Sequence, residues 1–262
     1  MIIVRQHGTR FDDTEVARHY AHRAPYAAVS YEFLQGLVVQ HRYVLDLGSG
    51  PGKIAGEMAS WFERVDAVDS SLPMLRRGQA LHAGSTNIRW IHARAEDAAL
   101  EGPYDLVTIG AAAHWMDHAV VFPKLVKVME KDGVLAMMDG DGPHQPPWQA
   151  AWVVFLRRWL ERFGGKYDRA RFGDAVAAYE RWMDVAGRRT FLFDHRQSVA
   201  DFVACQHSRA TWTMARLGEA AGARFDQELT ELLGPFAHDG QLEFSVQTNL
   251  VWGTPRSCLV EP

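Results

Sequence analysis

The chain has 262 residues, of which 47% are hydrophobic and 23% charged, a composition typical of a soluble globular protein with a sizeable core. The formal net charge of −4 gives no overall attraction to nucleic acid or anionic membranes, so we expect neither as a partner. Cys205 and Cys258 are too few for a disulfide framework or a zinc cluster, and we expect no metal site. The first residues resemble neither a signal peptide nor a spanning helix. These features favour a cytoplasmic protein, either a monomer or a homodimer.

The N-terminal part predicts a helical segment in front of the first strand. Residues 1–10 predict a loose terminus, Phe11 to Tyr31 a helical or half-helical lead-in, and Glu32 to Gln40 a helix. The lead-in is rich in aromatic side chains, including Tyr20 and Tyr26. These aromatic residues either pack on the core or cover a ligand.

Strands and helices then alternate along the chain. The apolar runs predict strands at Tyr43–Leu47, Arg64–Val68, Ile88–His92, Tyr104–Ile109 and Val134–Met138. Helical patterns cover Gly52–Phe62, Pro73–Ala83 and Ala119–Val128, and Lys131 to Gly133 predict a turn into the fifth strand. Repeated strand–helix–strand units with short connections indicate an α/β protein with a doubly wound, Rossmann-like, mostly parallel sheet of seven strands.

The alternation ends at residues 139–147, a stretch rich in glycine and proline that suits neither a helix nor a central strand. Beyond it, we expect helices at Trp148–Phe163, Asp174–Ala186 and Ser198–Leu217, a strand at Arg189–His195, and a final edge strand at Leu242–Trp252. The chain therefore divides into a ligand-binding core with an N-terminal lid (1–140), a mainly helical cap (141–240) and a returning strand (241–262).

A glycine-rich turn stands between the first strand and the next helix. Gly48, Gly50 and Gly52 let a ligand approach the backbone, and the helix that follows directs free N–H groups at that ligand. Asp69 ends the second strand about twenty residues after Gly48, where a carboxylate accepts hydrogen bonds from both hydroxyls of a ribose. The pair predicts a nucleoside ligand, with an ordinary strand-to-helix turn as the alternative.

The glycine pattern separates two nucleoside cofactors. It is G-x-G-x-G rather than the dinucleotide pattern G-x-G-x-x-G. Leu45 to Gly52 resembles the first signature of class I S-adenosylmethionine-dependent methyltransferases, and Asp69 to Leu75 resembles the second. The resemblance implies S-adenosylmethionine as the cofactor. It assigns the methionine end of the cofactor to Asp46 and the glycine turn, including Ser49, and the ribose and adenine to Asp69, Ser70 and Met74.

Further cofactor contacts follow from the same resemblance. Ala95 and Glu96 lie in a segment similar to the one that contacts adenine in the family, although Arg94 stands where an acid is usual. Gly110 ends the fourth strand, where a small residue admits the sulfonium. Tyr20 and Tyr26 match an N-terminal segment that covers the cofactor in many small-molecule methyltransferases, with Tyr26 reaching the substrate.

After the fourth strand, the sequence Ala-x-His-Trp-x-Asp resembles the branch of trans-aconitate and UbiE-like (type 11) methyltransferases. The chain lacks the Asn/Asp-Pro-Pro-aromatic clamp of enzymes that methylate nucleobase or glutamine nitrogens. His114 is a candidate general base, because imidazole titrates near neutral pH. A structural role for His114 and Trp115 in bracing the pocket stays open, as does a substrate contact for Trp115. His114 and His118, with Asp117 between them, have the spacing of some zinc sites, but nothing supplies a convincing third ligand.

The cap carries most of the remaining candidates. Its tryptophans either stack a planar substrate or form the core of the cap itself. Gln206, His207 and Arg209 lie in a predicted helix, where they would bind a carboxylate or heteroatom of the substrate.

The sequence predicts an S-adenosylmethionine-dependent methyltransferase that transfers a methyl group to an O or N atom of a small-molecule acceptor, planar or carboxylate-bearing. Two alternatives are an NAD(P)-dependent oxidoreductase on a similar sheet and an S-adenosylmethionine-binding protein without catalysis.

Overall fold

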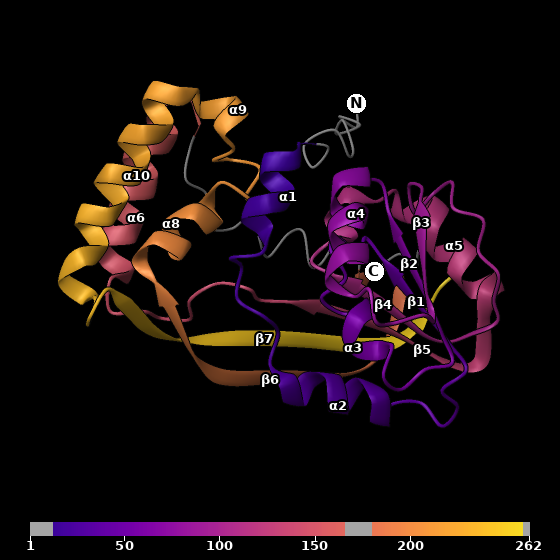
Figure 1. The fold of residues 1–262 in the computed structure, drawn as a ribbon. Coiled ribbons are helices and arrows are strands. Elements are labelled where there is room, and N and C mark those ends of the chain that lie inside the picture. Colours follow the sequence, from indigo (N-terminus) through magenta and orange to yellow (C-terminus); the bar gives the residue numbers. More distant parts are fainter. Residues whose placement is uncertain (1–12, 166–179, 259–262) are drawn as a thin grey trace.

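The computed structural model describes residues 13–165 and 180–258, and its centre is a sheet with the strand order β3-β2-β1-β4-β5-β7-β6 (Figure 1). The strands are β1 (Tyr43–Leu47), β2 (Arg64–Asp69), β3 (Ile88–His92), β4 (Tyr104–Gly110), β5 (Met129–Asp139), β6 (Met183–Ser198) and β7 (Gln241–Pro255). β1 to β5 run parallel, whereas β7 is antiparallel to both of its neighbours, β5 and β6. The predicted α/β fold with a seven-stranded, mostly parallel sheet is confirmed.

The helices fall into two groups. Those in front of and between the core strands are α1 (Thr14–Tyr20), α2 (Ala28–Gly36), α3 (Ala55–Met58), α4 (Leu72–Leu81), the short 3-10 helix η1 (Ala113–Trp115) and α5 (His118–Val128). Those of the cap are α6 (Gln149–Arg162), α8 (Val199–Gln206), α9 (Met214–Leu217), α10 (Glu219–Leu233) and the 3-10 helix η2 (Gly234–Phe236). None of the helices in the described parts of the chain is long and apolar enough to cross a membrane.

Alternate residues of the central strands bury two separate apolar cores. Val44 of β1 and Leu106 of β4 pack with α2 and α3 on one face of the sheet. Their neighbours Leu45 and Val107 pack with α5 on the other face. Successive side chains of a strand point to opposite faces, so a sheet covered on both faces needs continuously apolar strands.

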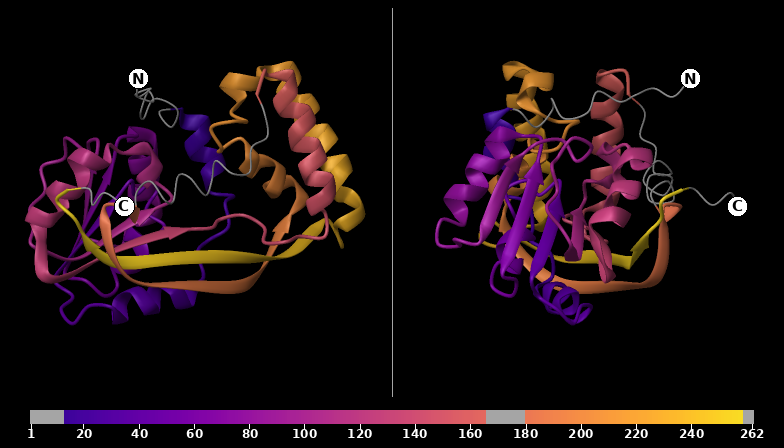
Figure 2. Two further views of the ribbon diagram at one scale, coloured as in Figure 1. Left: turned by 180° about the vertical axis from the view of Figure 1, so that it is seen from behind. Right: turned by 90° about the vertical axis from the view of Figure 1, so that its right-hand side faces the viewer.

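The cap has an aromatic core of its own. Trp148, Phe155 and Trp159 of the α6 region are each about 1% exposed and pack against Phe225 of α10 and Phe244 of β7. The views in Figures 1 and 2 place the cap helices at one end of the molecule and the α/β core at the other, with α1 between them. Of the two roles considered for the cap tryptophans, the structure places Trp148 and Trp159 in the cap core.

Two long antiparallel strands join the cap to the core. β6 and β7 pair continuously from Met183↔Pro255 near the core to Ser198↔Gln241 beneath the cap, with one register shift between Val185 and Gly187. The end of β7 nearer the core also pairs with β5. Figure 2 shows both strands running along the underside of the molecule. The cap is therefore an extension of the sheet as well as an insertion.

Several predicted elements are confirmed. β1 and β3 have the predicted bounds, β2 and β4 end one residue later than predicted, and α4, α5 and α6 lie within two residues of prediction. The predicted N-cap Ser198 accepts a hydrogen bond from the N–H of Asp201 at 3.0 Å. These elements have strong local signals, either an apolar run bounded by turn residues or a capped helical pattern.

Other predicted elements are wrong. The predicted helix Gly52–Phe62 shrinks to α3 because the chain continues in turns through residues 51–54. The helix predicted to reach Ala186 is replaced from Met183 onward by β6, and its residues 174–179 lie outside the described part. The predicted turn at 131–133 is an irregularity within β5, where the pairing moves from Tyr104↔Met129 to Leu106↔Val134.

Two further corrections concern the end of the chain. The helix predicted for Ser198–Leu217 is broken into α8 and α9 by turns at 207–213. β7 is not an edge strand, because β6 pairs with its outer side. Long-range strand pairing decides such positions, and local periodicity carries no information about it.

A buried hydrogen bond beneath β1 offers a test of the core. The hydroxyl of Tyr104 donates to Asp66 Oδ2 at 2.6 Å, and both side chains are fully buried. We expect Tyr104→Phe to lower the free energy of unfolding by about 1–3 kcal/mol, because it leaves a buried carboxylate oxygen without its donor. Urea unfolding followed by circular dichroism measures the difference. Tyr43→Phe is the control, since the half-buried ring of Tyr43 packs against Arg64. Equal stability of the two variants would contradict the assignment.

Candidate active site

The glycine-rich loop closes tightly against the end of β4. Gly48, Gly50 and Gly52 have φ values of 68°, 54° and 83°, the left-handed region that favours glycine. A Cβ atom on Gly48 would lie 2.4 Å from the Cβ of Ala112, so the close approach also requires glycine there. The N–H groups of Gly48 and Ser49 donate to Val68 O at 2.8 and 3.0 Å, which fixes the loop to β2.

Asp69 connects this loop to the end of β2. Its Oδ2 accepts a hydrogen bond from Gly50 N at 2.8 Å, and its Oδ1 accepts one from Ser71 N at 2.7 Å. Both carboxylate oxygens are thus fixed by backbone N–H groups, one from the glycine-rich loop and one from the N-cap residue of α4. The predicted pair of glycine turn and acid is therefore a connected unit.

Asp46 is a buried carboxyl group directly beneath the loop. It is 1% exposed, and it accepts hydrogen bonds from Thr108 Oγ1 at 2.9 Å and Ala55 N at 3.2 Å. Burial raises the pKa of Asp46 to about 7, and the two hydrogen bonds oppose this shift. Asp46 thus changes its charge near neutral pH.

A narrow cavity runs from the loop to the N-terminal segment. Its lining residues are Tyr20, Tyr26, Asp46, Gly48, Ser49, Lys53, Ile54 and Gly110. A Cβ on Gly110 would lie 2.7 Å from Ile54 Cδ1 and 3.3 Å from the Tyr26 hydroxyl, so the wall is closely packed there. Ser49 Oγ is buried and has no hydrogen-bond partner in the described residues, which leaves it available to a ligand. Five residues predicted to contact the cofactor or substrate before β4, and Gly110, thus line one cavity.

The remaining predicted cofactor residues lie along the neighbouring strand ends. Met74 of α4 is buried against Val16 and Ala17 of α1, and the carbonyl of Ser70 lies 3.0 Å from His92 Nε2. Ala95 is buried after β3. Glu96, which follows it, accepts a hydrogen bond from Asp117 N at 2.8 Å. Burial raises the pKa of Glu96, but this hydrogen bond and the nearby Arg94 lower it more, so the group stays charged.

His114 and Trp115 form η1 and lie outside the set of residues that line the cavity. Their rings contact each other, with centroids 4.7 Å apart. Asp117 caps α5 by accepting from Ala119 N, and His118 Nε2 lies 2.8 Å from Ala113 O. No group of three His, Cys, Asp or Glu side chains within the described residues could hold a metal ion. The general-base role of His114 stays a prediction.

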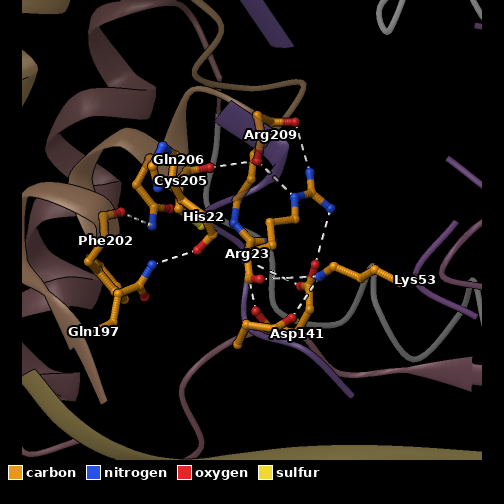
Figure 3. A network of polar contacts seen from close by, with 11 residues as sticks. His22, Arg23, Lys53, Asp141, Gln197, Phe202, Cys205, Gln206 and Arg209 are labelled. Carbon is orange, nitrogen blue, oxygen red and sulfur yellow. Dashed lines mark hydrogen bonds and ion pairs between the residues drawn. The ribbon is translucent and has the colours of Figure 1, made fainter. Parts of the chain in front are cut away.

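A network of buried charges lies beside the cavity, where the N-terminal lid (residues 20–27), the cap and the end of β5 meet (Figure 3). Arg23 donates from Nη1 to Asp141 Oδ2 at 3.2 Å, and Arg209 donates from Nη2 to Asp141 Oδ1 at 3.3 Å. Arg23 also donates to Ser208, from Nε to Oγ and from Nη2 to the carbonyl, both at 2.8 Å. The side chains of Arg23 and Asp141 are 10% and 14% exposed, whereas that of Arg209 is 33% exposed.

The charges of this network do not balance. Burial raises the pKa of Asp141, but Arg209, Arg23 and Lys53 outweigh that effect and hold the pKa well below its usual range. Burial lowers the pKa of Arg209, and its proximity to Asp141 outweighs this and raises it overall. Both groups therefore stay charged. Three cations face one carboxylate, which leaves room for a further anion.

Two residues predicted to contact substrate have structural partners instead. Gln206 is buried and donates from Nε2 to Phe202 O within α8. His207 has both ring nitrogens at 2.7 Å from acceptors, Nδ1 from Trp212 O and Nε2 from Asp226 Oδ1. Burial lowers the pKa of His207, but these two partners raise it overall, which favours a cation held within the cap. These contacts favour a structural role for both residues.

Sequence reasoning missed Lys53 and Asp141. Lys53 stands in the glycine-rich motif, whose prediction rests on the glycines and the backbone N–H groups. Asp141 lies in the irregular segment after β5. A signal was available for Asp141, since it follows the carboxyl end of a parallel strand, the edge where ligands bind in such sheets. Nothing in the sequence indicates that Asp141 meets Arg23 from 118 residues earlier.

Comparison with known proteins finds methyltransferases among the relatives of this chain. Residues 44–133 match the family model described as a methyltransferase domain. The chain is 38% identical over 181 residues to the trans-aconitate 2-methyltransferase of Azoarcus sp. (strain BH72), covering 57% of this chain and 69% of that protein. It is 39% identical over 101 residues to the tRNA 5-carboxymethoxyuridine methyltransferase of Escherichia coli (strain K12), covering 36% of this chain and 39% of that protein.

A solved structure of a type II methyltransferase from Anaeromyxobacter dehalogenans has the same fold. Its TM-score is 0.66 at 20% sequence identity, and the match covers 91% of this chain and 99% of the other. At this identity the likeness concerns the fold alone. It extends beyond residues 44–133 and so includes the cap.

The bonds of Asp69 give a first prediction for this site. We expect Asp69→Ala to raise the dissociation constant for S-adenosylmethionine at least about tenfold, because hydrogen bonds to a charged group contribute roughly 1.5–3 kcal/mol each. Calorimetric titration measures the change. Asp132→Ala is the control, since Asp132 is exposed near the opposite end of the parallel strands. Wild-type affinity in Asp69→Ala would remove the assigned ribose contact.

The pKa of Asp46 gives a second prediction. A carboxyl with a pKa of about 7 is mostly neutral at pH 5.5, and a cationic ligand binds better to its charged form. We therefore expect the affinity for S-adenosylmethionine to rise between pH 5.5 and 7.0, by at most about tenfold per pH unit. Titration in two buffers of different ionisation enthalpy should show proton release on binding. Asp46→Asn should abolish both effects, and a pH dependence that survives this substitution would contradict the assignment.

Proposed function

Because the chain belongs to the class I S-adenosylmethionine-dependent methyltransferases, we propose that it transfers the methyl group to a carboxylate oxygen of a small-molecule acceptor. Its cofactor is S-adenosylmethionine. The family assignment replaces the alternatives of a nicotinamide-dependent oxidoreductase and a protein without catalysis. The acceptor class is the part that we propose.

The residues of the cavity suit this cofactor. The positive φ angles of the glycine-rich loop and the space that a Cβ on Gly48 would fill provide a close approach to the backbone. Ser49 Oγ supplies an unpartnered buried hydroxyl, and Asp69 supplies a carboxylate fixed against the loop by Gly50 N. Tyr20, Asp46 and Gly110 would hold the methionine end, while Ser70, Met74, Ala95 and Glu96 would contact the nucleoside.

The observation that carries the acceptor proposal is the convergence of Arg23 and Arg209 on one carboxylate beside the cavity (Figure 3). Each guanidinium has five N–H donors in a planar arrangement that matches carboxylates, and Asp141 engages only part of this capacity. The partly exposed Arg209 would bind the acceptor carboxylate from the open side. Tyr26 and Trp115 would complete the acceptor site.

A carboxylate acceptor also suits the protonation states available. S-adenosylmethionine, when bound, supplies a methyl group activated by a positively charged sulfur. A carboxylate is deprotonated at neutral pH, so the residues around it need only to orient it and exclude water. Under this proposal no base is required, and His114 would shape the site instead of removing a proton.

The names of two relatives are consistent with this acceptor class. One protein is named for trans-aconitate and the other for 5-carboxymethoxyuridine in tRNA, and both of these compounds carry carboxyl groups. The second protein acts on RNA, so the expectation that this chain binds no nucleic acid stays a prediction. Transfer to tRNA but to no small carboxylate would replace the small-molecule part of the proposal.

The test is acceptor screening followed by substitution of Arg209. With a panel of small di- and tricarboxylates, we expect methyl transfer whose product is a base-labile ester. Arg209→Gln should raise the KM for the acceptor by about tenfold or more, since a charged hydrogen bond contributes roughly 1.5–3 kcal/mol. The dissociation constant for S-adenosylmethionine should stay within about threefold.

Arg216→Gln is the matched control, because Arg216 is exposed at the nearby α9. It should leave both constants unchanged. An unchanged acceptor KM in Arg209→Gln, or turnover confined to neutral amines and alcohols, would remove the carboxylate proposal.

A further inference from the structure

Lys53 is a partly buried lysine that belongs to the glycine-rich loop but makes its hydrogen bonds to the N-terminal segment. Its Nζ donates to Ala24 O at 2.6 Å and to Arg23 O at 3.4 Å. The same ammonium group lies 5.3 Å from the ring centroid of Tyr20 and 5.9 Å from that of Tyr26. One side chain of the loop thus contacts four residues of the segment that covers it.

We infer that Lys53 is a positioning residue, which holds residues 20–27 over the glycine-rich loop and thereby fixes the guanidinium of Arg23 in the acceptor site. Its effect on the reaction rests on the proposed carboxylate acceptor. Its effect on the segment does not.

The segment of residues 20–27 has two further anchors. Gln197 of β6 donates to His22 O, and Ala27 N donates to Thr248 Oγ1 of β7 at 2.9 Å. Both of these anchors are on the long β6–β7 pair. Lys53 adds the anchor that ties the segment to the loop itself.

Arg23 links this segment to the proposed acceptor site. Its backbone carbonyl accepts from Lys53, while its guanidinium bonds to Ser208 and Asp141. The guanidinium also lies 4.2 Å from the ring centroid of Tyr20. That ring lies 3.9 Å from the position of a Cβ on Gly50. The glycine-rich loop, the Tyr20 ring and the Arg23 guanidinium therefore lie next to one another in space. Lys53 belongs to the loop, and its ammonium group lies over the ring.

Burying the ammonium group of Lys53 costs free energy. Burial is the main cause that lowers the pKa of Lys53 to about 8, so the fold loses free energy by keeping a cation there. A methionine or leucine would fill the same space without that cost. The carbonyls and aromatic rings around Nζ offset part of the free energy of burial, and the same contacts hold the segment in place.

The test compares three variants saturated with S-adenosylmethionine. Lys53→Met keeps the aliphatic stem and removes the cation, Lys53→Gln keeps a shorter donor, and Lys53→Arg keeps charge and donors. Hydrogen exchange of the amides in residues 20–27, read by mass spectrometry, should be about tenfold faster in Lys53→Met and near wild type in Lys53→Arg. Lys53→Gln should lie between them. Unchanged exchange in Lys53→Met and Lys53→Gln would overturn the inference.

Lys124→Met provides the matched control for this measurement. Lys124 Nζ donates to the carbonyls of Ala95, Glu96 and Ala98, which is the same kind of contact elsewhere in the core. Its removal should speed exchange near residues 95–98 and leave residues 20–27 unchanged. Faster exchange of residues 20–27 in Lys124→Met as well would show general loosening and would overturn a specific role for Lys53.

A double-mutant cycle separates positioning from general stabilisation. Lys53→Met should raise the acceptor KM about tenfold and have almost no further effect on KM in an Arg23→Gln background. Multiplicative effects would show that Lys53 does not act through Arg23. If carboxylates are not the acceptors, the exchange measurement still decides the role of Lys53, so the two failures are distinguishable.

Discussion

The structure depends on one buried carboxylate that joins three parts of the chain. Asp141 leaves the end of β5, Arg23 comes from the N-terminal segment, and Arg209 comes from the turns after α8. A buried charge costs several kcal/mol unless it is paired and hydrogen-bonded, so neither arginine can leave without exposing or neutralising Asp141. The closed arrangement of lid and cap over the loop is therefore an electrostatic requirement. It also places the cations next to the cofactor cavity.

The β6–β7 pair makes this requirement achievable. The two strands continue from the core sheet to the cap as one antiparallel ladder, and β7 contributes Leu242, Phe244 and Val246 to the aromatic core of the cap. A ladder of backbone hydrogen bonds holds the cap at a fixed distance from the loop. Arg209 can then meet Asp141 without a flexible linker between them. The position of the cap relative to the core therefore follows from the pairing of β6 with β7.

The core was predictable from the sequence because its signals are local. The apolar run of β1, the glycines after it and Asp69 at the end of β2 each follow from neighbouring residues, and they meet because parallel strands share an edge. The cap was less predictable. Residues 183–185 have a helical pattern yet pair with β7, and His207, predicted to bind a ligand, bonds to Asp226. Lys53 and Asp141 gain their meaning from contacts distant in sequence, which single-sequence patterns do not contain.

The distribution of charge around the cavity follows a simple division. Acids lie on the side of the loop, with Asp46 beneath it and Asp69 bonded to Gly50. Arginines lie on the other side, toward the cap, where Arg23 and Arg209 share Asp141. A cofactor with a positive sulfur is attracted by the first group, and an anion by the second. We infer that this separation brings opposite charges together between the loop and the cap, where methyl transfer neutralises both. An acceptor without negative charge would leave the arginines with an unbalanced positive charge next to a cationic cofactor.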